Sequence, residues 1–340
     1  TPSGVLLLED HVPYVLGTRP RFVLDGVGHG WRRQVSYQVR SDVRGRFEIG
    51  PMTVRVSDAF GFVELGRAFR TTVPLVVTPR ILPLPPIPLG GGWTGSGDNR
   101  PRAFAFGSAE DVTVREYRQG DDLRRVHWRS SARTGDLMVR REEQPWQSRA
   151  TLLVDNRLIV HRGQGIASSL ETAVTLTASI AAHLSQRGFA VRLVTAGGEA
   201  GANAWHLRDS ELNTGPLLEA LAVLETDQRS RLDTSWMGEQ SGGLTIAVFG
   251  ALNQYDVPVL RRVAHHSSAA LAVCLDVEAW AGSRTGTGDA SRDAVSSTVL
   301  ASAGWRAVTL GPQDKMDTAW EQLGRMSGAR GGVAATAPGA

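Results

Sequence analysis

The chain has 340 residues, which exceeds one typical domain of roughly 100–200 residues, so we expect two domains with separate cores. Hydrophobic residues make up 41% and charged residues 21%, and no stretch reaches the ~20 consecutive apolar residues of a membrane-spanning helix, so we expect this chain to be soluble. Its only cysteine, Cys274, excludes an intramolecular disulfide and a cysteine-pair metal site. The net charge is +3, and the only lysine, Lys315, lies outside any Gly-x-x-x-x-Gly-Lys phosphate-binding loop.

The first part of the chain has the pattern of antiparallel β-structure. Short alternating segments are separated by turn residues such as Arg44-Gly45 and Gly50-Pro51, at a spacing of about ten residues. We therefore predict an antiparallel β-sandwich-like domain over residues 1–81. Its predicted strands cover residues 37–40, 46–49, 52–56 and 72–77.

Residues 82–100 are rich in proline and glycine and are predicted to form a linker. The prolines of 83–88 favour a stiff extended chain, whereas the glycines at 90–92 favour a loose one. This is the clearest domain boundary by composition.

Residues 101–149 contain a run of closely spaced arginines, carboxylates, aromatic residues and glycines. Asp121 or Asp122 is suited to begin a short helix over 123–132, and Gly135 is suited to end it. The alternation after Gly135 indicates a strand that includes Arg140. The run therefore predicts a strand, a turn, a short helix and a second strand between the two domains.

Two interpretations of this run are open. In the favoured one, Arg124 and Arg129 bind carboxylates of the run and Trp128 is the apolar plug of an internal ion-pair clasp. In the other, the arginines form an exposed surface for an acidic partner, a phosphate or nucleic acid. The residues that carry either role are Glu116, Tyr117, Arg118, Gly120, Asp121, Asp122, Arg124, Trp128, Arg129, Arg133, Gly135 and Arg140.

Residues 150–326 change to alternating strands and helices. Apolar, unalternated strands separated by helices are typical of a parallel sheet covered on both faces, so we predict a doubly wound α/β domain. The Gly- and Ser-rich loop 281–296 and the tail 327–340 are predicted to be mobile and disordered, respectively. The predicted strands cover 150–155, 190–195, 244–249, 269–275 and 305–310, and the predicted helices cover 168–186, 212–224, 257–265 and 316–323.

The run also carries a family resemblance. It resembles the core motif of the bacterial domain of unknown function 58 family through Glu116-Tyr117-Arg118-x-Gly120-Asp121-Asp122-x-Arg124-x-x-x-Trp128-x-x-Ser131-Ala132-Arg133-x-Gly135-x-Leu137-x-x-Arg140. A second match is similar to the upstream β segment of the same family, namely Arg44-Gly45-Arg46-Phe47-x-x-Gly50-Pro51 followed by Asp58-x-Phe60-Gly61.

The resemblance implies a setting for the protein. Family members generally carry two transmembrane helices upstream of a β domain and a von Willebrand factor A-like domain after the motif, and their genes lie beside those of MoxR-type AAA+ ATPases. Because the chain begins at Thr1 without a methionine, we expect a membrane anchor in a missing upstream segment. The resemblance then implies a bacterial membrane protein whose present portion faces the cytoplasm and has a MoxR-type ATPase as partner.

The implied von Willebrand factor A-like domain can be tested for a metal site. Metal-binding members of that fold hold Mg²⁺ with Asp-x-Ser-x-Ser after the first strand, because a hard cation needs oxygen ligands. Here the string is Asp155-Asn156-Arg157-Leu158-Ile159, which lacks both serines, and Gly250-Ala251-Leu252-Asn253 lacks the later acidic residue. We predict a degenerate metal site in which Asp155 pairs with an arginine or caps a helix, and we expect no cofactor.

Three functional hypotheses follow. The favoured one is a non-catalytic protein–protein interaction or adaptor protein that works with a MoxR-type ATPase in chaperone-like assembly or cell-envelope processes. The second is an arginine-mediated binder of nucleic acid or anionic lipid, with nucleic acid the less favoured partner. The third and least favoured is a metal-dependent enzyme near Asp155. The sequence leaves the oligomeric state open.

Overall fold

The structure is a computed structural model whose chain divides into two compact units. One unit comprises Thr1–Gly91 together with Arg149–Ala340, and the other comprises Gly92–Ser148. Within the described residues, no helix combines the length and the hydrophobicity that a membrane span requires. The described residues are 5–25, 28–57, 62–89, 114–116, 128–140, 149–200, 214–237, 243–281 and 290–328.

The first part of the chain forms antiparallel sheets, as predicted. Its strands are β1 (Leu6–Glu9), β2 (Arg21–Leu24), β3 (Gly45–Ile49), β4 (Thr53–Ser57), β5 (Glu64–Ala68) and β6 (Val73–Val77). One sheet has the order β2-β1-β4-β5, and the other pairs β3 with β6. The predicted strands 46–49, 52–56 and 72–77 correspond to β3, β4 and β6. The predicted strand 37–40 is wrong, since its residues belong to no strand.

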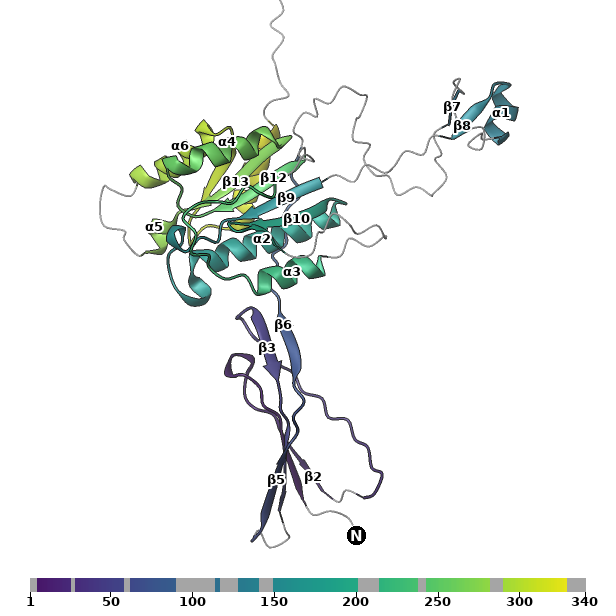
Figure 1. Ribbon diagram of the computed structural model, residues 1–340, viewed down its shortest axis with the longest axis vertical. Helices are drawn as coiled ribbons and strands as arrows, with labels where there is room; N and C mark the ends of the chain where they lie inside the picture. Colours follow the sequence, from purple (N-terminus) through teal and green to yellow (C-terminus); the bar gives the residue numbers. More distant parts are fainter. Residues whose placement is uncertain are drawn as a thin grey trace, which may run out of the picture. The chain divides into compact units, whose positions relative to one another are not determined.

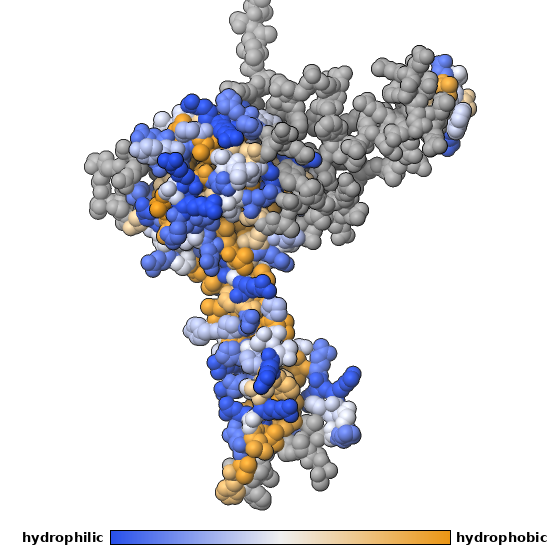
Figure 2. All heavy atoms as spheres, in the orientation of Figure 1, coloured by the Kyte–Doolittle hydropathy of each residue, from blue (hydrophilic) through white to orange (hydrophobic). Residues whose placement is uncertain are grey.

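A side-chain contact, in place of a strand, joins the segment around Tyr37 to the larger sheet. The ring of Tyr37 lies 6.1 Å from that of Phe22, and its hydroxyl donates to the Asp10 carboxylate at 2.6 Å. Figure 2 shows apolar residues in orange over these antiparallel strands, and Phe62 is 87% exposed. The antiparallel part therefore leaves much apolar surface uncovered by its own residues.

The second part of the chain forms one six-stranded sheet with the order β11-β10-β9-β12-β13-β14. Five strands are parallel, and β11 pairs antiparallel with β10 at the edge. The predicted mixed α/β content is confirmed. The strands are β9 (Arg149–Val154), β10 (Ala190–Thr195), β11 (Gly198–Glu199), β12 (Leu244–Phe249), β13 (Ala269–Leu275) and β14 (Arg306–Leu310).

Helices cover both faces of this sheet (Figure 1). The helices are α2 (Ser169–Gln186), α3 (Gly215–Ala222), α4 (Val257–His265), α5 (Val277–Trp280), α6 (Ala290–Ser302) and α7 (Met316–Gly328). Alternate strand residues point to opposite faces. Leu152 packs in a core cluster with residues of α2, α3 and α7, whereas Leu153 packs in a second cluster with residues of α4 and α6. The two cores place the sheet between two helical layers.

Two C-terminal predictions are corrected by the helices. The loop predicted over 281–296 is wrong from Ala290 onward, where α6 begins, and α7 continues to Gly328, past the predicted end at 323. Neighbouring parallel strands need a crossover connection, and α6 supplies it between β13 and β14. Because α6 is rich in serine, its sequence showed no clear helical pattern of apolar residues, although a few of them, such as Val299 and Leu300, pack on the sheet.

Residues 82–89, expected to begin the linker, pack on the α/β part. Leu84 and Ile87 are buried in the same core cluster as α2 and α7. The indole of Trp320 donates to the Pro85 carbonyl at 3.0 Å, and Arg187 donates to the Ile87 carbonyl at 3.1 Å. The prolines thus restrict the backbone of a segment that packs on the α/β part.

Arg44 fastens the antiparallel part to the α/β part. Its guanidinium donates two hydrogen bonds to the Glu171 carboxylate, at 2.9 and 2.8 Å. It also donates to the carbonyls of Leu221, Ala222 and Leu224 at the end of α3, at 2.6, 3.1 and 2.7 Å. A cation is favoured at a helix C-terminus, where carbonyls lack intrahelical partners. One side chain therefore connects β3 to α2 and α3.

We predict that Arg44→Met destabilises the protein by about 2–4 kcal/mol, because the apolar replacement leaves a partly buried carboxylate without its counter-charge and removes one donor from each of three carbonyls. Urea denaturation measures this change. The exposed neighbour Arg46 gives a matched control, and Arg46→Met is expected to cost less than about 1 kcal/mol. Equal losses for the two variants would contradict the role of Arg44.

Candidate functional site

The carboxyl ends of β9 and β12 define the candidate site. The chain passes from β9 to β10 on one side and then returns to β12 on the other, so the strand order reverses between β9 and β12. In doubly wound sheets, ligands bind outside the strand ends at such a switch point. Asp155 and Arg157 follow β9 directly, and Asp256 lies in the segment after β12.

These three side chains form a buried ion-paired triad. Arg157 donates from Nε to Asp155 Oδ1 at 2.9 Å and from Nη2 to Asp155 Oδ2 at 2.7 Å. Its Nη1 donates to Asp256 Oδ1 at 2.8 Å and to the Ser230 carbonyl at 3.0 Å. The side chains of Asp155 and Arg157 are fully buried. The guanidinium therefore fills the place at which the topology favours a ligand.

Neighbouring residues hold the triad in place. The Asn156 side chain accepts from the Ala196 N–H at 3.0 Å and donates to the Glu225 carbonyl at 2.7 Å. Asp256 also accepts from the Asn253 N–H at 3.1 Å through Oδ2, in a capping box at the start of the 3-10 helix Gln254–Asp256. The site is thus a closed network of satisfied polar groups.

His161 lies beneath the same loop. Its Nε2 is hydrogen bonded to the Asp155 carbonyl and its Nδ1 to the Ser169 hydroxyl, at 3.0 Å for the latter. Because a carbonyl only accepts, Nε2 carries the proton, and Nδ1 accepts from Ser169 in the neutral ring. Burial lowers the pKa of His161, although the Asp155 carbonyl and carboxylate oppose this shift. The histidine is therefore a neutral structural support of the loop.

The residues of this site do not fit a divalent cation. Burial alone would lower the pKa of Arg157, but hydrogen bonds and charge from Asp155 and then Asp256 raise it overall, so its guanidinium is charged. That positive charge occupies both Asp155 oxygens, and the Ile159 side chain offers no oxygen ligand. In the described part of the chain, no three His, Cys, Asp or Glu residues are grouped to hold a metal. Asp155 instead pairs with an arginine, one of the two roles expected for it.

The structure describes part of the arginine-rich run. β7 (Val114–Glu116) pairs antiparallel with β8 (Met138–Arg140), and α1 (Trp128–Thr134) lies between them in sequence. Gly135 ends α1 with a left-handed φ of 83°, as predicted. The predicted site residues Tyr117, Arg118, Gly120, Asp121, Asp122 and Arg124 lie outside the described residues.

The described residues of the run differ from the clasp interpretation. Trp128 is 72% exposed, so it is not an apolar plug, and Arg129 and Arg133 are exposed as well. The physical reason is that α1 has only seven residues and no large apolar side chain besides Trp128, so it has no apolar stripe to bury. The structure brings these residues onto one short helix but does not place them in a core.

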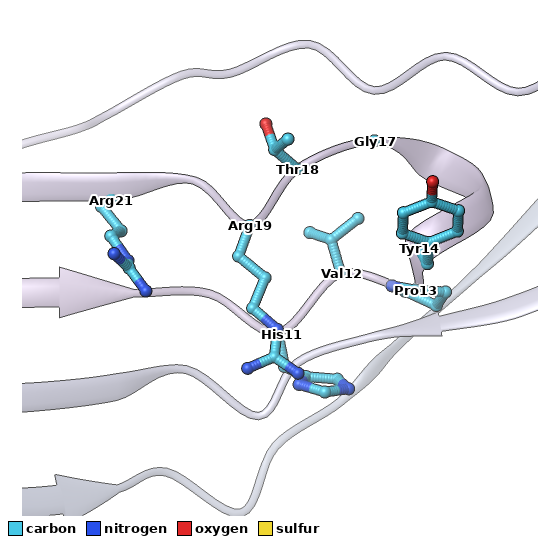
Figure 3. Close-up of a pocket in the computed structure, with 8 residues that line it drawn as sticks. All are labelled: His11, Val12, Pro13, Tyr14, Gly17, Thr18, Arg19 and Arg21. Atoms are coloured by element: carbon cyan, nitrogen blue, oxygen red, sulfur yellow. The ribbon is translucent and has the colours of Figure 1, made fainter.

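A hollow of about 490 Å³ in the antiparallel part was not predicted (Figure 3). His11, Arg19 and Arg21 give it a basic lining. Glu9 lies 3.3 Å from Arg21 and 3.8 Å from Arg19, so part of this charge is already compensated. No sequence signal pointed to it, because His11 and Arg21 are ten residues apart and the pairing of β1 with β2 brings them together.

We predict that Arg157→Met destabilises the protein by about 3–5 kcal/mol, because it leaves two buried carboxylates without their counter-charge. The matched control is Arg229→Met, since Arg229 also forms an ion pair with an aspartate but is 54% exposed. That change is expected to cost less than about 1 kcal/mol. Chemical denaturation measures both, and a small loss for Arg157→Met would show that the triad is dispensable.

A second prediction concerns pH. Because the pKa of His161 is lower in the folded than in the unfolded protein, the unfolded chain binds the proton more readily. This contribution to stability is complete above pH ~6.5 and is lost as the pH falls through the lower folded pKa, by at most about 1.4 kcal/mol per pH unit.

His161→Gln should reduce that dependence of the unfolding free energy between pH 7 and 5, with His29→Gln, at an exposed position, as control. An unchanged slope in His161→Gln would contradict the prediction.

A family model matches the part of the chain that contains both the run and the triad loop. No curated protein matches the sequence. The match covers residues 113–211, from β7 through β11, and therefore includes Asp155 and Arg157. Over these residues the chain resembles the family described as protein of unknown function DUF58.

Proposed function

We propose that the protein is a non-catalytic protein–protein interaction or adaptor protein. The observation that carries this proposal is the buried triad of Asp155, Arg157 and Asp256, which fills the switch point of the sheet with the protein's own charged groups. Because the protein's own side chains fill this site, the loops around it are proposed to form an interaction surface. The proposed partner is a MoxR-type AAA+ ATPase, and the proposed processes are chaperone-like assembly or cell-envelope functions.

Finer assignments are part of this proposal, and the fold motivates the first of them. The α/β part is proposed to be a von Willebrand factor A-like domain, because Asp155 directly follows the first strand of a doubly wound sheet, where metal-binding members of that fold carry their ligands. The antiparallel part is proposed to be sandwich-like. An upstream membrane anchor, with this portion facing the cytoplasm, completes the proposed arrangement.

The exposed side chains of α1 favour a second candidate function. Trp128, Arg129 and Arg133 together offer an aromatic face and two guanidinium groups. Arginines beside an exposed aromatic ring suit anionic lipid headgroups or nucleic acid. Binding of this kind falls steeply with salt concentration, since phosphate contacts release counterions.

We predict that the chain captures a MoxR-type ATPase in a pull-down and that the amount captured depends on whether the ATPase is empty, ADP-bound or bound to a non-hydrolysable ATP analogue. Removal of divalent cations with a chelator after nucleotide loading should not change the surface that this chain contributes to the contact. The reason is that the Arg157 guanidinium, in place of a bound metal, holds the triad together. An unrelated AAA+ ATPase is the control. Failure to bind in every nucleotide state would count against the adaptor role.

A further inference from the structure

A cavity of about 720 Å³ lies within the first unit, where the antiparallel part meets the α/β part. Its lining comes from the chain before β3, from the chain between the end of β6 and residue 82, from α2 and the loop before it, and from the start of α7. Pockets for small ligands have volumes of roughly 300–1,000 Å³ and often lie where two packed parts of a protein meet. This cavity, called the junction pocket, therefore has the size and the place of a ligand site.

Hydrogen bonds within the protein hold the walls of the junction pocket. The Ser41 hydroxyl donates to the Val43 carbonyl at 2.8 Å and accepts from the Val43 N–H at 2.9 Å. In another wall, the Leu82 N–H donates to the Ser179 hydroxyl of α2 at 2.9 Å, and Pro79 is buried. A pocket that is formed before its ligand arrives loses little conformational entropy on binding.

One ion pair of the lining is already complete. Arg44 binds the Glu171 carboxylate through two hydrogen bonds, at 2.9 and 2.8 Å, and its remaining hydrogen bonds go to three carbonyls at the end of α3. Because the two charges cancel, this pair adds no net charge to the junction pocket.

Two other guanidinium groups of the lining have no such counter-charge. Arg40 and Arg80 are exposed, and in the described part of the chain neither side chain takes part in a hydrogen bond or an ion pair. Asp42 is the remaining carboxylate of the lining, which leaves a balance of one positive charge. Beside the start of α7, the exposed Lys315 and Asp317 offset each other. An anion of single charge brings the lining to neutrality, whereas a cation doubles its charge.

Much of the remaining lining is apolar. Val77, Leu82 and Met316 are half-buried, and Ile166 is 64% exposed. Removal of such surface from water favours the binding of an apolar group. The junction pocket therefore combines an apolar surface with two unpaired guanidinium groups.

We infer that the junction pocket binds a small organic anion of single charge that carries an apolar body, such as a carboxylate on an alkyl chain. Arg40 and Arg80 bind the carboxylate, since a guanidinium forms strong charge-assisted hydrogen bonds with it. Ile166 and Met316 contact the alkyl chain. The triad residues are not part of this lining, so the site goes beyond the proposed interaction role.

Three small molecules test the chemistry by isothermal titration calorimetry. Octanoate has the anionic head and the apolar body, octylamine has the same body with a cationic head, and acetate has the head alone. Octanoate should bind at least about tenfold more tightly than either of the others, with an affinity that falls with salt. Equal binding of octylamine, equal binding of acetate, or no binding of octanoate would overturn the inference.

Arginine variants locate the anionic head. The double variant Arg40→Gln/Arg80→Gln should weaken octanoate at least about tenfold and reduce the salt dependence. The matched control is Arg46→Gln, an exposed arginine of β3 outside the lining, which should change the affinity less than about twofold. Circular dichroism checks that each variant is folded. Unchanged octanoate binding in the folded double variant would contradict the inference.

A further variant locates the apolar body. Ile166→Ser should weaken octanoate at least about threefold and leave its salt dependence unchanged, because it removes apolar contact and no charge. Val295→Ser on α6, at an apolar residue that is 43% exposed, is the matched control and should have no effect. An equal loss in the two variants would place the alkyl chain outside the junction pocket and overturn the inference.

Stability gives an independent measure, because the lining comes from both parts of the first unit. Octanoate should raise the unfolding temperature of the wild type and not that of the double variant Arg40→Gln/Arg80→Gln, since a ligand stabilises the state that binds it. An equal rise in both would show binding at another site. The ATPase pull-down contains no octanoate, so its failure would reject the proposed partner without affecting these results.

Discussion

The structure of the candidate site depends on one buried guanidinium. Removing Arg157 and its two aspartates from water costs several kcal/mol per ion, and only well-aligned hydrogen bonds offset that cost. Here Asp155, Asp256 and the Ser230 carbonyl meet that requirement with four donor–acceptor distances of 2.7–3.0 Å. Asp155 lies on the same segment as Arg157, whereas Asp256 and Ser230 lie on two others. Moving the Asp256 segment therefore leaves a buried carboxylate unpaired, and moving the Ser230 segment leaves a guanidinium N–H without its acceptor.

This constraint has a consequence for regulation. A sheet edge organised by a bound metal responds to the concentration of that metal, whereas an edge organised by a covalently attached cation is always formed. Burial of His161 in its neutral form adds a second restraint on the same loop, through the Asp155 carbonyl and Ser169. The physical chemistry therefore favours a preformed surface over a metal-gated switch, in keeping with the proposed adaptor role.

The sequence predicted some parts of the structure closely and missed others for identifiable reasons. Continuous apolar runs located β10, β12 and β13 to the residue, because buried parallel strands need such runs. Strand β1 was missed, since Leu6–Leu8 shows no alternation, and α6 was hidden by its serines. Asp155 was singled out by its place after the first strand, whereas Asp256 lies 99 residues from Arg157 and only the fold joins them.

The second unit interrupts the sequence of the first, and the two parts of the first unit are joined by contacts of their own. Residues 82–89 already pack on α2 and α7, and Arg44 already fixes β3 to α2 and α3. The contacts that join the antiparallel part to the α/β part are therefore made by residues outside 92–148.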